Sequence, residues 1–70
     1  MNIHNITIDQ LLKFIDLRTS LWIWIGIDDL TFIGYAYELF EPKYNELITN
    51  NIKEMYYQYD TLNILLEDED

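Results

Sequence analysis

Apolar and polar positions divide the chain into stretches of helical and of extended periodicity. Between Thr7 and Asp16, apolar residues recur at i, i+3, i+4 and i+7, the spacing of one helix face. Thr7 and Gln10 have the spacing of a capping box, in which each side chain satisfies a backbone amide at a helix start. We therefore expect a first helix over residues 7–16. Its apolar stripe consists of Ile8, Leu11, Leu12 and Ile15.

The next stretch, residues 19–27, reads "TSLWIWIGI" and is rich in the β-branched and aromatic residues of strands. Asp28 and Asp29 follow as turn residues, and residues 30–40, "LTFIGYAYELF", predict a second strand. The short connection favours an antiparallel hairpin. Gly34 inside the second strand indicates a bulge or a close approach of backbone.

The first of these strands alternates aliphatic with aromatic residues instead of apolar with polar ones. Since side chains alternate across a strand, we expect Leu21, Ile23 and Ile25 to point inward and Trp22 and Trp24 to point to the opposite face. Two ways of covering the tryptophans remain open. A second helix or a bent sheet covers them within the monomer, or a symmetric dimer buries them.

The second half of the chain predicts one more helix and one more hairpin. Pro42 suits the first turn of a helix, and Asn50 and Asn51 can close one. A short apolar stripe lies between them, at Tyr44, Leu47 and Ile48. Residues 52–59 and 61–68 read as strands, with Asp60 in the turn between them. The predicted fold class is α+β, a four-stranded antiparallel sheet with two helices in the order α-β-β-α-β-β.

Composition sets further limits on function. Seventy residues make a single domain, residues 1–70, of which residues 67–70 form an acidic tail. There is no cysteine, and the one histidine, His4, cannot build a metal site alone, so we expect no metal or cofactor. The one serine, Ser20, begins a predicted strand and has no evident base, and no phosphate-binding loop occurs, so we expect no enzyme. No apolar run reaches membrane-spanning length and no signal peptide is evident, which favours a cytoplasmic protein without a membrane partner.

Charge points to the kind of partner. Thirteen acidic residues face four basic ones, which gives a net charge of -9. DNA-binding proteins neutralise phosphates with Lys and Arg, so direct binding to nucleic acid is disfavoured. The same acidity can imitate nucleic acid, because an arginine that grips a phosphate can grip a carboxylate. The candidate partner-binding residues are Asp28, Asp29, Glu38, Glu41, Glu46, Glu54, Glu67, Asp68, Glu69 and Asp70, together with Tyr35 and Tyr37. Further tyrosines expected at the surface are Tyr56, Tyr57 and Tyr59.

The segments "ITIDQLLKFID", "EPKYNELITNNI" and "YDTLNILLED" resemble, in length and element order, small α+β proteins of phages and prophages of AT-rich Gram-positive bacteria. That group includes anti-CRISPR proteins and other inhibitors of host defence or DNA-processing enzymes, several of them acidic DNA mimics. The resemblance implies an inhibitor in the host cytoplasm and carries over no specific site.

Two functional hypotheses follow. The first is a phage-encoded inhibitor of a host defence nuclease, with a CRISPR effector as the preferred target and a restriction enzyme next. Its acidic surface would occupy the nucleic-acid-binding site of this basic host protein. The alternative is a non-catalytic homodimeric or adaptor module that uses the aromatic face of Trp22 and Trp24.

Overall fold

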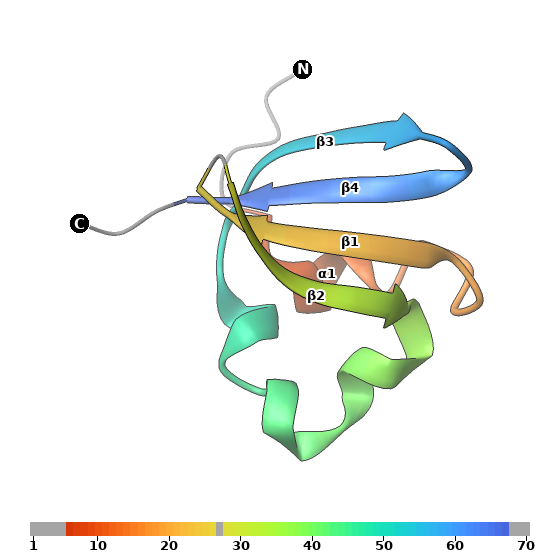
Figure 1. Cartoon of the computed structure of the whole chain (residues 1–70). Helices are drawn as coiled ribbons and strands as arrows, with labels where there is room; N and C mark the ends of the chain where they lie inside the picture. Colours follow the sequence, from red (N-terminus) through yellow and green to blue (C-terminus); the bar gives the residue numbers. More distant parts are fainter. Residues whose placement is uncertain (1–5, 27, 68–70) are drawn as a thin grey trace.

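The computed structural model describes residues 6–26 and 28–67, which form one four-stranded sheet and one short α-helix. The strands are β1 (Ser20–Ile25), β2 (Asp29–Tyr35), β3 (Ile52–Gln58) and β4 (Thr61–Leu66). They are ordered β2-β1-β4-β3 across the sheet (Figure 1). β1 and β2 form an antiparallel hairpin, as do β3 and β4, whereas β1 and β4 run parallel. The prediction of an entirely antiparallel sheet is therefore wrong, and the sheet is mixed.

The parallel pair at the centre results from the connection between the two hairpins. Residues 36–51 leave the end of β2 at one edge of the sheet and return to begin β3 at the other edge (Figure 1). Because the chain travels back along the sheet before β3 begins, β3 runs in the same direction as β2. β4 then returns antiparallel to β3 and so parallel to β1. Parallel pairing requires a long connection of this kind, and a hairpin loop cannot supply it.

The first helix, α1 (Ile8–Leu11), is shorter than predicted. Its start follows the expected pattern, because the backbone N–H of Thr7 donates to Oε1 of Gln10 at 2.9 Å. The N–H of Leu12 still bonds the carbonyl of Ile8, but the next two backbone bonds, from Lys13 and Phe14, join residues three apart. Asp16 then accepts a bond from the backbone N–H of Arg18 at 2.9 Å. An aspartate that bonds the backbone two residues on favours a turn, so the chain turns again at residues 16–18.

The predicted second helix does not form, and the predicted second strand ends early. Three 3-10 segments take their place, η1 (Ala36–Phe40), η2 (Pro42–Tyr44) and η3 (Leu47–Thr49). Pro42 disfavours helical geometry at Glu41, which is extended with φ -69° and ψ 142°. The side chains of Thr49 and Asn50 donate to the carbonyl of Glu46 at 2.8 and 3.0 Å. Such side-chain bonds compete with the backbone bonds of an α-helix.

Gly34 explains where β2 ends. A Cβ at this position would lie 2.8 Å from Oε2 of Glu38 and 2.9 Å from Cζ of Phe32. The close approach at Gly34 is therefore made by side chains and not by backbone as predicted, and the register shift of the hairpin lies between Ile23 and Trp24. The space lets Glu38 Oε2 accept a bond from the backbone N–H of Tyr35 at 2.9 Å. This bond caps the first turn of η1 and turns the chain away from the sheet.

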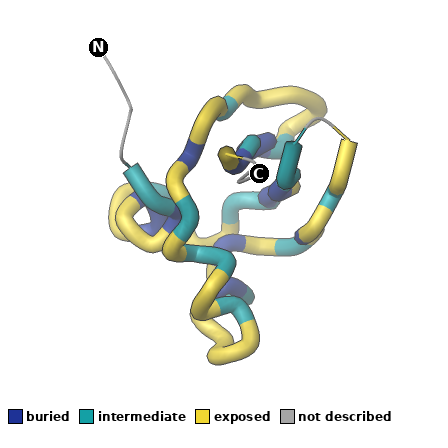
Figure 2. Tube along the Cα trace, turned by 90° about the vertical axis from the view of Figure 1, so that its left-hand side faces the viewer, coloured by how far each residue is buried: buried dark blue, intermediate teal, exposed yellow. Residues whose placement is uncertain are grey.

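The core lies on one face of the sheet. Leu21 and Ile23 are buried as predicted, and Ile25 packs at the margin of the core. Figure 2 shows buried positions among exposed ones along the trace. In β1 the exposed Trp22 lies between the buried Leu21 and Ile23, whereas the central part of β4 is buried at three successive positions. The remaining buried apolar residues are Ile8, Leu11, Leu12, Phe32, Ala36, Leu39, Ile52, Leu62, Ile64 and Leu66. The predicted stripe at Tyr44, Leu47 and Ile48 packs against this core although it is not helical.

Candidate functional site

The second face of the sheet is the main candidate site. α1 and η1 contribute their buried side chains to the core on the first face, so this second surface, which we call the open face, is left to solvent. The strand register assigns to it Leu30, Ile33 and Tyr35 of β2, Ser20, Trp22 and Trp24 of β1, Thr61, Asn63 and Leu65 of β4, and Glu54, Tyr56 and Gln58 of β3. The prediction that Trp22 and Trp24 point away from the core is confirmed. No described segment forms a second layer over them.

In the middle of the open face, large side chains surround one smaller, buried side chain. The register places Ile33, Trp22, Asn63 and Tyr56 side by side across β2, β1, β4 and β3. Ile33 is 62% exposed, whereas Asn63 is 5% exposed. The amide of Asn63 therefore lies at the bottom of a depression whose walls are aromatic.

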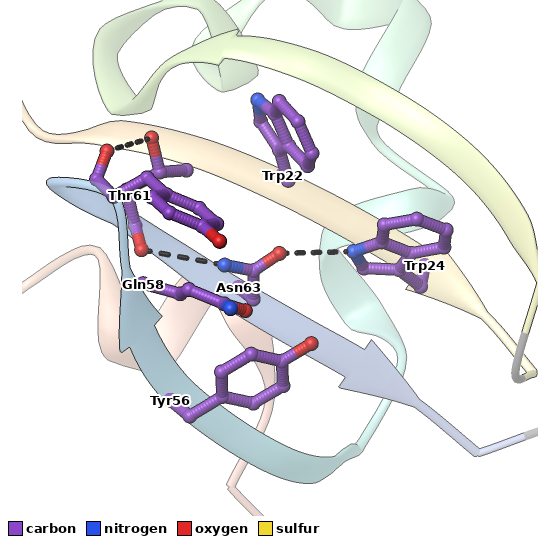
Figure 3. A pocket seen from close by; sticks show the side chains of 7 residues that line it. Trp22, Trp24, Tyr56, Gln58, Thr61 and Asn63 are labelled. Carbon is purple, nitrogen blue, oxygen red and sulfur yellow. Dashed lines mark hydrogen bonds between the residues drawn. The ribbon is translucent and has the colours of Figure 1, made fainter.

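Hydrogen bonds hold this depression in shape. Nε1 of Trp24 donates to Oδ1 of Asn63 at 3.1 Å, and Nδ2 of Asn63 donates to the carbonyl of Thr61 at 3.4 Å (Figure 3). Buried polar groups in native proteins have such partners, so the bonds explain how an asparagine is tolerated within a strand. The ring centroids of Trp22 and Trp24 lie 6.3 Å apart, with 55° between their planes.

The depression forms a cavity of about 170 Å³. Its lining residues are Trp22, Trp24, Tyr56, Gln58, Tyr59, Thr61 and Asn63 (Figure 3). Tyr59 reaches it from the β3–β4 turn, where Tyr59 and Asp60 have φ angles of 56° and 58°. Positive φ at both central residues is the geometry of a type I′ turn, which favours Asn and Gly. A tyrosine there is unusual, and the unfavourable backbone places its ring at the rim of the cavity.

Five of the predicted acidic residues gather at one end of the sheet. Asp29 pairs with Ile25, which pairs with Leu66, and Leu66 pairs with Ile52, so these positions form the last row. Around this row lie Asp28, Asp29, Glu46, Glu54 and Glu67, together with the basic Lys43 and Lys53, and we call this region the acidic end. Asp68, Glu69 and Asp70 of the predicted set lie outside the described residues.

The other predicted partner-binding residues in the described part of the chain have local contacts. Glu38 is half-buried and caps the backbone of Tyr35. Glu41 is 3.9 Å from Nζ of Lys43. Tyr35 and Tyr37 stack with 5.7 Å between centroids and 8° between planes, at the end of β2 away from the acidic end. The structure thus divides the predicted set into two groups.

Sequence reasoning missed three of the residues that line the cavity, Asn63, Gln58 and Thr61. A signal for Asn63 exists in "TLNILL", where a polar residue that strands disfavour interrupts an apolar run. Such a residue needs a hydrogen-bonding partner if it is buried, and an indole N–H is one of the available donors. Which donor it meets depends on the parallel pairing of β1 with β4, and the sequence pattern did not indicate that pairing.

Comparisons with known proteins assign no function to this site. No protein-family model, no curated protein and no solved structure matches this chain. Within residues 6–26 and 28–67, no helix is long and apolar enough to cross a membrane. The same residues contain no group of three or more His, Cys, Asp or Glu side chains placed to hold a metal ion.

Proposed function

We propose that this protein is a non-catalytic binding module that docks a basic protein partner on the open face of its sheet. The observation that carries the proposal is the aromatic character of this face. A sheet face left to solvent in a two-layer domain is typically polar, whereas Trp22, Trp24, Tyr56 and Ile33 lie together here. Exposed apolar patches of this kind mark interaction sites, and Trp and Tyr are the residues enriched at them.

The negative net charge of the chain favours a basic partner. Among the strand positions assigned to the open face, Glu54 is the one acidic residue and none is basic. A second copy of the chain would bring another net charge of -9 into the complex, whereas a basic partner gains attraction and faster association. We therefore propose a basic protein as the partner, and the alternative to be tested against it is a homodimer.

The test compares two substitutions that each replace an exposed apolar residue by glutamate. Ile33→Glu changes the open face, and Phe14→Glu changes a residue that is 81% exposed and follows α1, the helix that packs on the core face of the sheet. Each variant is immobilised and incubated with bacterial lysate, and bound basic proteins are identified by mass spectrometry, purified and titrated by calorimetry. We expect a purified partner to bind the parent chain and Phe14→Glu but not Ile33→Glu.

Two results would contradict the proposal. One is equal binding of the purified partner to both variants. The other is a dimer in sedimentation experiments that Ile33→Glu dissociates, because the open face would then be covered by a second copy of the chain.

A second candidate is an inhibitor that imitates nucleic acid. It is supported by the acidic end, which gathers five carboxylates from the β1–β2 turn and the start of β2, the segment before β3, strand β3, and the residue that follows β4. Its targets would be nucleic-acid-binding proteins of the host, a CRISPR effector first and a restriction enzyme next. Such a complex depends on charge, so it should form quickly and weaken with salt.

Neutral substitutions distinguish the two candidates. Asp28→Asn, Asp29→Asn and Glu67→Gln together remove three negative charges from the acidic end and leave the open face intact. The inhibitor should lose most of its affinity for a nuclease with this triple variant and little with Ile33→Glu. The binding module should show the opposite order.

A further inference from the structure

We propose that the cavity in the open face holds a cationic side chain, lysine or arginine, of the basic partner. This inference rests on the proposed function and adds the chemistry of its central contact. With a volume of about 170 Å³, the cavity lies below the roughly 300–1,000 Å³ of pockets for drug-sized ligands. It has room for one side chain, as the central pockets of protein interfaces do.

The walls of the cavity favour a cation. Trp22, Trp24, Tyr56 and Tyr59 contribute aromatic rings, and no lining residue is basic. A cation within about 6 Å of a ring centroid is attracted by the negative face of the ring, most strongly for tryptophan. Tilted rings that surround a depression offer several such faces at once, and Figure 3 shows Trp22 and Tyr56 on either side of Asn63.

Two hydrogen bonds inside the cavity are compatible with a cationic occupant. The indole N–H of Trp24 is directed to Oδ1 of Asn63, and one of the two amide N–H groups of Asn63 is directed to the carbonyl of Thr61. These two donors are therefore already used within the protein. A cation interacts with the negative faces of the rings and leaves both bonds intact, whereas a carboxylate or phosphate over the same faces would be repelled by them.

Negative charge lies close to the rim. Glu54 precedes Tyr56 by two positions on the same face of β3, and Asp60 lies between the lining residues Tyr59 and Thr61. Tyr59 is held at the rim by a left-handed backbone that a tyrosine seldom adopts. Strained backbone of this kind persists where the surrounding structure requires it, often at binding sites.

The test uses short peptides that differ in one charge. The acetylated and amidated peptides Gly-Gly-X-Gly-Gly carry arginine or its neutral counterpart citrulline, and lysine or its neutral counterpart acetyl-lysine, at X. Binding is followed by NMR at the indole N–H signals and by fluorescence. Because the chain contains two tryptophans and both line the cavity, these signals report on the site itself. We expect each charged peptide to bind about 3- to 30-fold more tightly than its neutral counterpart.

Matched variants locate the effect. Tyr56→Leu removes a ring from the cavity, and Tyr57→Leu removes the neighbouring tyrosine, which is 67% exposed and points to the other face of β3. We expect Tyr56→Leu to abolish most of the preference for charge and Tyr57→Leu to preserve it. Trp22→Leu is a second test of the same kind should Tyr56→Leu fold poorly.

Three outcomes would overturn the inference. The first is equal affinity for arginine and citrulline, which would indicate a merely apolar cavity. The second is an equal effect of Tyr56→Leu and Tyr57→Leu. The third is tighter binding of tetramethylammonium than of either charged peptide, which would indicate a free cation as the ligand. The peptide titration needs no partner and the capture experiment with Ile33→Glu needs no peptide, so the inference and the proposed function can fail separately.

Discussion

The hydrogen bond between Trp24 and Asn63 allows a quantitative test of how the open face is built. It joins β1 to β4 across the parallel pair, with 3.1 Å between Nε1 and Oδ1. The perturbation is a double-mutant cycle of Trp24→Phe, which removes the donor, and Asn63→Ala, which removes the acceptor. The cycle isolates the pairwise free energy because each single variant already lacks the bond.

The expected loss of unfolding free energy depends on how exposed the two bonded side chains are. A neutral hydrogen bond contributes about 0.5–1.5 kcal/mol, and a polar group left buried without a partner costs about 1–3 kcal/mol. Trp24 is half-buried beside a cavity that opens to solvent, so water can reach its N–H when Asn63 is removed. We therefore expect Asn63→Ala to lower the free energy of unfolding by about 1 kcal/mol, which lowers Tm by roughly 4–8 °C in a domain of this size. Trp24→Phe should cost more because it also removes buried ring area.

The measurement is equilibrium unfolding in urea for the parent, both single variants and the double variant. Trp22 remains in all four proteins and supplies the fluorescence signal. We expect a coupling free energy of about 1 kcal/mol between the two sites. Changes that add within about 0.3 kcal/mol would refute the reasoning, because the bond would then contribute nothing measurable to the native sheet.

Three further substitutions test the rest of the fold. Gly34→Ala should destabilise the protein by about 1–3 kcal/mol, because the new Cβ displaces the side chain of Glu38 and breaks its bond to the backbone of Tyr35. The loss should be smaller in a Glu38→Ala background, and an equal loss there would argue against this close approach. Replacing the β3–β4 turn by Tyr59→Asn with Asp60→Gly should raise stability by about 1 kcal/mol, and an unchanged Tm would argue against the type I′ geometry. Leu39→Ala removes a fully buried side chain of η1 and should cost about 2–5 kcal/mol in thermal or urea unfolding, whereas a smaller cost would show that η1 packs loosely.

Local patterns were sufficient for part of the fold. The alternation of aliphatic and aromatic residues in β1 correctly assigned Leu21 and Ile23 to the core and both tryptophans to the other face. Side-chain orientation along a strand has a period of two, so a single well-defined strand determines it. The aromatic half of the candidate site could therefore be predicted from the sequence.

The fold class could not be predicted in the same way. Whether β1 pairs parallel or antiparallel with β4 depends on the path of residues 36–51, which no pattern within either strand encodes. The prediction of a second helix was wrong because the side chains of Thr49 and Asn50 donate to the carbonyl of Glu46. That prediction rested on apolar spacing and did not account for the tendency of such side chains to compete with the backbone bonds of a helix. Asn63 acquired its role through the same unforeseen strand pairing.

The parallel pairing of β1 with β4 also has a consequence for the route by which the chain folds. Each hairpin joins neighbours in sequence and can close quickly, whereas the central pair brings Leu21 to Leu62 and must form late. Until it forms, β1 exposes one unpaired edge of "SLWIWI", an uncharged segment of high β-propensity that can pair with another molecule. Refolding yield should therefore fall as protein concentration rises. By placing β1 between β2 and β4, the native sheet removes from solution the segment most prone to aggregate.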